Sequence, residues 1–190
     1  QWSHAISITA IVVALLSPFM GALADKGGYR KMFMFFFTWL TIIATTVLYF
    51  VLPGQVIRAL FWFVLANIGF EMGSVFCNAY LPDISHSKNI GRISGYGWSL
   101  GYVGGLLSLA LAMFFLVQTD TPIFGFLKGE AGAYQNIRAT NLLVAVWFAV
   151  FSIPTFLFVK DKKPDTKAFL KNAKHTLKGF RSTANELRSY

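Results

Sequence analysis

The sequence predicts an all-α integral membrane protein with five transmembrane helices and an amphipathic helix at the membrane surface. Hydrophobic residues make up 55% of the 190 residues and charged residues only 13%, about half the charged share of a soluble domain. Five windows carry at most one charge each, and each is long enough to cross the hydrocarbon core, which takes about 20 residues of helix. Only helices satisfy every backbone group over such lengths in lipid. The windows are residues 5–24, 32–52, 59–82, 93–117 and 139–159.

The boundaries of these windows carry recognisable signals. No basic residue precedes the first window, and its apolar run is longer than the core of a signal peptide, so we interpret it as a span. The Pro53-Gly54 turn separates the second window from the third. The longer connection 118–138 contains several Gly residues and mixed charges, and we expect an ordered loop or a short interfacial helix there. The run from Lys160 to Pro164 ends the fifth window.

The chain divides into a transmembrane bundle, residues 1–159, and a basic linker segment, residues 160–190. In the basic segment, apolar residues share one face of a helix, and Lys and Arg gather along an adjoining arc. This pattern is typical of a helix that lies on an anionic membrane surface. Nucleic-acid or calmodulin-type binding shares the pattern. Because the other basic residues flank the spans, we expect the lipid bilayer as partner, and no nucleic acid.

Lys and Arg are distributed unevenly between the two sides of the membrane. Connections 25–31 and 83–92 and the C-terminal segment hold 14 of them, whereas the alternate connections hold three. The positive-inside rule therefore places Gln1 outside and Tyr190 in the cytoplasm. Since the chain begins with Gln and its ends fall on opposite sides, we expect a fragment that lacks an upstream span.

A charged, glycine-containing hairpin lies between the first two windows, at residues 21–31. It resembles the loop signature between the second and third helices of the major facilitator superfamily. That signature is a Gly, three residues, an Asp, a basic residue, any residue, a Gly and two basic positions. Tyr29 occupies the first of the two closing positions, a departure that Lys31 offsets. The matching residues are Gly21, Asp25, Lys26, Gly28 and Arg30.

A second segment narrows this resemblance. The stretches Asn78–Ile84 and Gly91–Gly105 resemble the vacuole-effluxer-like branch, the family of the fungal vacuolar amino-acid effluxer and its many bacterial relatives. The resemblance covers nearly the whole chain, as the second to sixth helices of an N-terminal half. It implies an absent first helix, an absent C-terminal six-helix half of the same protein, and location in a bacterial inner (plasma) membrane.

The resemblance also implies a cytoplasmic gate. Asp25 is expected to meet the N-terminal end of a helix in the other half, where the helix dipole favours a carboxylate. Arg30 and Lys31 are candidates to pair with Asp83 and so connect the two inner loops. The alternative is that these charges only set the topology through contacts with lipid head groups.

Glu71 is the only acidic residue inside a predicted span. An acid at this depth costs free energy, and it indicates a functional site by default. Three other polar residues fall within an arc of about 60° around it on the same helix. We expect this face to line a central cavity, where Glu71 holds a substrate ammonium group or carries a coupling proton. The alternative is a structural carboxyl group, protonated or hydrogen-bonded to a neighbouring helix. The four residues are Asn67, Glu71, Ser74 and Asn78.

Polar residues of the second window also share one face, within about 60°. They can line a cavity, but threonine can equally bond to a carbonyl group of its own helix. The sequence leaves both interpretations open. The residues are Thr38, Thr41, Thr45 and Tyr49.

The fourth window carries glycines at a four-residue spacing, Gly97, Gly101 and Gly105. Such a face lets two helix backbones approach closely, so we expect a tight helix–helix seam. Trp98 and Tyr102 lie beside the glycines. They are candidates to face the cavity, or else aromatic anchors at the membrane interface.

These observations favour a secondary active transporter for a small polar solute, which works by alternating access between two halves. The resemblance points to an amino acid or similar metabolite, exported and coupled to protons. The chain carries no P-loop motif, and we expect no catalytic residue, metal or cofactor, so an enzyme is disfavoured. The alternative is a non-transporting membrane receptor or scaffold built on a transporter fold.

Overall fold

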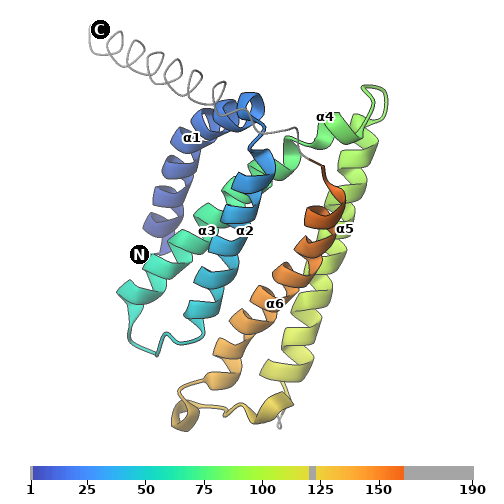
Figure 1. The fold of residues 1–190 in the computed structure, drawn as a ribbon. Helices are drawn as coiled ribbons and strands as arrows, with labels where there is room; N and C mark the ends of the chain where they lie inside the picture. The colour runs from blue at the N-terminus through green and yellow to red at the C-terminus, as the bar shows by residue number, and fades with distance from the viewer. Residues whose placement is uncertain (1, 120–122, 161–190) are drawn as a thin grey trace, which may run out of the picture.

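The computed structural model describes residues 2–119 and 123–160, which form a bundle of helices (Figure 1). The expected amphipathic helix of the basic segment lies outside the described residues, as do the side chains of residues 22–27. The described elements agree with the all-α class that the sequence predicts. The helices are α1 (Trp2–Gly27), α2 (Arg30–Leu48), α3 (Val56–Asn78), α4 (Leu81–Ile84), α5 (Ile90–Ala112) and α6 (Gln135–Phe158).

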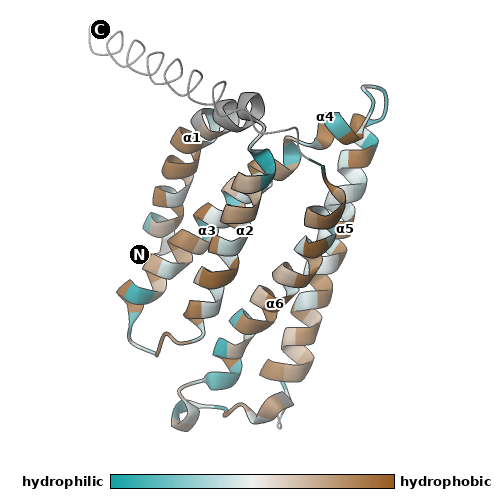
Figure 2. Ribbon diagram, in the orientation of Figure 1, coloured by the Kyte–Doolittle hydropathy of each residue, from teal (hydrophilic) through white to brown (hydrophobic). Residues whose placement is uncertain are grey.

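Four helical stretches among the described residues are long and apolar enough to span a membrane, and α1 adds a shorter apolar stretch, Ser3–Pro18. Figure 2 shows the long helices as mainly hydrophobic along their length. The chain is therefore an integral membrane protein of the expected kind. The four stretches are Arg30–Leu48, Val56–Ile84, Ile90–Val117 and Gln135–Phe158.

Two predicted windows continue beyond the helices that the structure contains. The second window reaches residue 52, but α2 ends at Leu48. Pro53 has no amide hydrogen to donate to the Tyr49 carbonyl and its ring would clash with that group, so a helix cannot continue from Tyr49 through Pro53. The third window reaches residue 82, but α3 ends at Asn78 and a short helix, α4, follows. Pro82 has no amide hydrogen to donate to the Asn78 carbonyl and its ring would clash with that group, so the chain turns before it.

The connection between α5 and α6 is ordered where the structure describes it, as the sequence predicts. A π-helical turn, Met113–Val117, ends α5, and two 3₁₀ turns follow, Ile123–Gly125 and Glu130–Gly132. The described part of the connection is thus a folded loop without an α-helix of its own.

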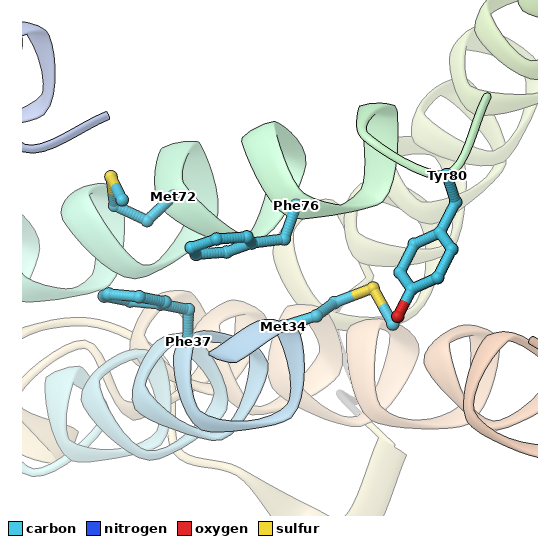
Figure 3. Close-up of a cluster of buried hydrophobic side chains, with 5 residues drawn as sticks. All are labelled: Met34, Phe37, Met72, Phe76 and Tyr80. Carbon is cyan, nitrogen blue, oxygen red and sulfur yellow. The ribbon is translucent and has the colours of Figure 1, made fainter. Parts of the chain in front are cut away.

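Helix α2 lies at the centre of the bundle, packed against α3 on one side and α6 on the other, while α1 covers α3 (Figure 1). Between α2 and α3, a cluster of buried side chains fills the contact (Figure 3). The ring of Phe76 stacks on Phe37, with centroids 5.8 Å apart, and on Phe33, at 5.5 Å. The buried cluster is Met34, Phe37, Met72, Phe76 and Tyr80.

The closest approach of α2 and α3 occurs at Gly69. A Cβ atom added there would lie 2.6 Å from the Thr41 hydroxyl oxygen and 3.0 Å from the Phe37 carbonyl oxygen. The Thr41 hydroxyl donates to that same carbonyl at 3.0 Å, and lies 3.4 Å from the Ala66 carbonyl oxygen of α3. Thr38 and Thr45 are buried as well. The burial of Thr38, Thr41 and Thr45 within the described bundle favours the structural interpretation of these three residues.

We predict that Gly69→Ala destabilises the protein, whereas Gly73→Ala does not. The methyl group at position 69 would force α2 and α3 apart, and overpacking of this kind costs about 1–3 kcal/mol. At position 73 the new Cβ would meet only the Phe37 Cβ, at 3.9 Å, which is an ordinary contact. Thermal unfolding of both purified variants in detergent measures the difference. Equal midpoints for the two variants would contradict the close contact at Gly69.

Candidate functional site

Four polar side chains follow one another along a single face of α3, as the sequence predicts. At about 100° per residue, this face lies roughly half a turn around the helix from the buried residues Gly69, Met72 and Phe76. The packing of α3 against α1 and α2 therefore directs the polar face away from both helices. Two of its members are exposed, and the other two are partly exposed. The residues of this polar face are Asn67, Glu71, Ser74 and Asn78.

Glu71 lies near the middle of the apolar stretch Val56–Ile84. Within the described part of the chain, no hydrogen bond or ion pair reaches its carboxylate. An ionised side chain that faced lipid at this depth would cost at least about 2–3 kcal/mol. The polar face therefore suits a water-filled cavity, or a polar partner outside the described residues, better than a lipid surface.

Arg30, at the start of α2, contacts the residues that follow the C-terminal end of α3. Its Nη1 donates to the Asp83 carboxylate at 2.7 Å and to the Ala79 carbonyl oxygen at 3.2 Å. The guanidinium carbon also lies 5.8 Å from the centroid of the Tyr80 ring. The Arg30 side chain is 15% exposed, while that of Asp83 is 47% exposed. The predicted pairing of Arg30 with Asp83 is thus present, and two further contacts support it.

Lys31 connects the start of α2 to the end of α6. Its Nζ donates to the Val159 carbonyl oxygen at 2.8 Å, and a cation is favourable beside the carbonyl groups at the end of a helix. Gly28 turns the chain between α1 and α2 with a φ of 69°, which glycine adopts without strain. The side chains of Asp25 and Lys26 lie outside the described residues, so the gate contact of Asp25 stays a prediction.

We refer to this end of the bundle, defined by residues 28–31, 79–89 and 159, as the motif end; it is uppermost in Figure 1.

The sequence profile of a family described as vacuole effluxer Atg22 like matches residues 3–190. The chain belongs to this family. The match confirms the resemblance that the hairpin and the segment after α3 indicate.

Two relatives illustrate the breadth of the Atg22-like family. The chain is 27% identical over 162 residues to an uncharacterized MFS-type transporter, YxiO, of Bacillus subtilis, which covers 84% of this chain and 36% of the relative. It is 21% identical over 218 residues to autophagy-related protein 22 of Yarrowia lipolytica, covering 85% of this chain and 35% of the relative. The chain thus spans little more than a third of either relative. No solved structure matches it.

The predicted site residues on α5 are not packed against other described helices. Trp98 and Tyr102 are 63% and 70% exposed, and their ring centroids lie 6.2 Å apart. A Cβ atom at Gly97, Gly101 or Gly105 would meet nothing within 4 Å in the described structure. For this Atg22-like chain, the glycine seam and the cavity-facing role of the two aromatic residues therefore stay predictions.

One contact at the opposite end of the bundle has no counterpart among the sequence predictions. Arg138 of α6 donates from Nη1 to the Tyr49 carbonyl oxygen at 2.8 Å, and its guanidinium carbon lies 5.5 Å from the Tyr49 ring centroid. Gln135 donates from Nε2 to the Tyr49 hydroxyl oxygen at 3.0 Å. The sequence presents Arg138 only as an indicator of topology, because its partner lies 89 residues away and no local pattern joins the two.

We predict that Arg30→Ala lowers the thermal stability of this Atg22-like protein more than Asp83→Asn does. The first change removes at least three contacts of a largely buried side chain. The second removes only the charge of a half-exposed carboxylate, which solvent screens, because the asparagine oxygen still accepts a hydrogen bond from Arg30. Lys88→Ala is the matched control, since Lys88 is an exposed basic residue at the same end. Unfolding midpoints in detergent give the order. A loss in Lys88→Ala as large as that in Arg30→Ala would contradict the proposed importance of the Arg30 contacts.

Proposed function

We propose that this chain belongs to a secondary active transporter that moves a small polar solute by alternating access. The solute is an amino acid or a similar metabolite, exported and coupled to protons. The single observation that carries the proposal is the polar face of α3, centred on Glu71 within an apolar stretch and directed away from the packed helices. The family supports transport, and the polar face supports a site for the solute.

In this proposal the polar face of α3 lines the central cavity. Glu71 holds the ammonium group of the solute or accepts the coupling proton, because it is the acidic residue of the face. The side chains of Asn67, Ser74 and Asn78 offer hydrogen-bond donors and acceptors on either side of it. Trp98 and Tyr102 on α5 are the further candidates to face the solute.

The contacts at the motif end support a gate. Arg30 joins the first turn of α2 to the residues directly after α3, and Lys31 joins the same turn to the end of α6. A movement of the hairpin would therefore act on both helices. We propose that Asp25 meets a helix dipole of a C-terminal half, and that breaking this contact opens the gate.

The orientation and the missing parts belong to the same proposal. The motif end faces the cytoplasm, since the basic residues gather in its connections. A first helix and a C-terminal six-helix half complete the protein, in line with the share of its relatives that this chain covers. The proposed location is a bacterial inner (plasma) membrane, whereas the family description names a vacuole effluxer.

We predict that Glu71→Gln reduces the initial rate of transport by the full-length protein roughly tenfold to a hundredfold. Loss of a hydrogen bond to a charged group costs about 1.5–3 kcal/mol, which corresponds to this range. Uptake of radiolabelled amino acids into proteoliposomes, with and without a pH gradient, measures the rate. Glu130→Gln is the matched control, because Glu130 is an exposed acid outside the spans.

The two roles of Glu71 predict different results. If Glu71 carries the proton, Glu71→Gln loses accumulation driven by the pH gradient but keeps exchange of labelled for unlabelled solute. If Glu71 binds the solute, both activities fall together. Wild-type rates in both assays would contradict the proposed site. Absence of transport by the wild-type protein for every amino acid tested would favour the receptor or scaffold alternative.

A further inference from the structure

The connection between α5 and α6 is folded against the end of the bundle opposite the motif end. The Leu127 amide donates to Gln135 Oε1 at 3.1 Å, and the Asn136 amide donates to the Leu127 carbonyl oxygen at 3.1 Å. Lys128 donates from Nζ to the Thr119 carbonyl oxygen at 2.6 Å. Leu127 therefore attaches the connection to the start of α6, and Lys128 attaches the later part of the connection to its beginning at Thr119.

A row of aromatic rings leads outward from this attachment. Tyr49, held by Arg138 and Gln135, contacts Phe126 edge-on, with ring centroids 6.1 Å apart. Phe126 in turn contacts Phe124 edge-on, at 6.4 Å. Phe124 is the outer end of the row, and its side chain is 89% exposed.

The backbone at Phe124 makes this exposure unusual. Its φ of 64° lies in the left-handed region, where a residue other than glycine costs of order 1 kcal/mol. Glycine would remove the strain, and the described chain uses the ring for one edge contact only. A large apolar side chain at a strained and exposed position indicates that something outside the described chain covers it.

The two ends of the bundle differ in the residues that their connections expose. At the motif end, the exposed residues of the loop after α4 are polar, for example His86, Lys88 and Asn89. At the opposite end, large apolar residues are exposed beside polar ones such as Lys128 and Glu130, and Figure 2 shows hydrophobic segments there. The exposed apolar residues include Phe50 (65%), Ile57 (86%), Phe114 (67%), Phe124 (89%) and Leu127 (59%).

We propose that Phe124 and Leu127, in the connection between α5 and α6, insert among the lipids of the interfacial layer, while the charged Glu130 of the same connection faces water. The connection starts and ends where two membrane-spanning stretches end, at Val117 and Gln135, so it lies at the depth of the lipid head groups. Exposed apolar side chains are present at the end of the preceding stretch as well, at Phe114 and Phe115. Lys128 beside the apolar residues matches the pairing of aromatic and basic side chains at membrane interfaces.

Lipid accounts for these observations better than a protein partner does. A bilayer surrounds a membrane-spanning bundle at this depth, and it covers scattered exposed rings without a shaped groove. The proposal rests on the membrane location of the chain and is independent of transport, so it can fail while the proposed function holds.

The test is a spin label at position 124 of the full-length protein, in vesicles of phosphatidylethanolamine and phosphatidylglycerol. The background is Cys77→Ala, since Cys77 is the only cysteine of this chain, with any further cysteines replaced as well. Phe124→Cys and Leu127→Cys are labelled, and Glu130→Cys, in the same connection, is the matched control. Collision with oxygen reports lipid, and collision with a nickel chelate reports water.

We predict that the ratio of oxygen to nickel collisions is several-fold higher at 124 and 127 than at 130. Leu127→Cys provides the result if Phe124→Cys does not fold. Nickel collisions at 124 and 127 as frequent as at 130 would overturn the proposal, because the connection would then lie in water. Labels shielded from both reagents would also overturn it, because protein and not lipid would then cover the side chains.

Discussion

The contact between α2 and α3 at Gly69 determines how the functional side chains of this protein are presented. Because glycine lacks a side chain, the α3 backbone approaches Thr41 and Phe37 closely, and this approach fixes the rotation of α3 about its own axis. The stacked rings of Phe37 and Phe76 hold the same face. In lipid, helices associate through such packing and not through the hydrophobic effect. The rotation set at Gly69 leaves the polar face of α3 directed away from α1 and α2.

The two features that we connect with transport, the polar face with Glu71 and the contact with Arg30, lie on α3 and directly after its C-terminal end. Glu71 lies about two turns, or about 12 Å along the axis, before Ala79, whose carbonyl group accepts a hydrogen bond from Arg30. In the proposed mechanism, a change in the hairpin that displaces Arg30 would therefore act on the helix that carries the polar face. This arrangement offers a short physical connection between gate and solute site, without a chain of intermediate residues.

The sequence predicts features that depend on spacing along one helix or on a local motif. The face shared by Asn67 and Glu71 follows from helical periodicity, and the pairing of Arg30 with Asp83 follows from their placement on neighbouring loops. The sequence does not single out Gly69, because its importance depends on which residue of another helix approaches it. The contact of Arg138 with Tyr49 is missed for the same reason.

A single sequence also does not predict where each helix ends, or which helix packs against a given face when that helix is not part of the described structure. The turn after Asn78 interrupts a window that hydropathy alone treats as continuous, because Pro82 acts through backbone geometry and not through polarity. Gly97, Gly101 and Gly105 predict a seam by their spacing, yet a Cβ atom at any of them would meet no described atom within 4 Å. For this face, spacing predicts the kind of contact but not its partner.

The most direct test of the account is the accessibility of the polar face of α3 to water within the membrane. Single cysteines at Asn67 and Ser74, in the Cys77→Ala full-length protein, are treated with a membrane-impermeant maleimide in vesicles. Val146 is the control, since it lies near the middle of α6 and is 61% exposed on an apolar surface. We predict that positions 67 and 74 react and that position 146 does not. Equal reactivity at all three positions would contradict the assignment of this face to a water-filled cavity.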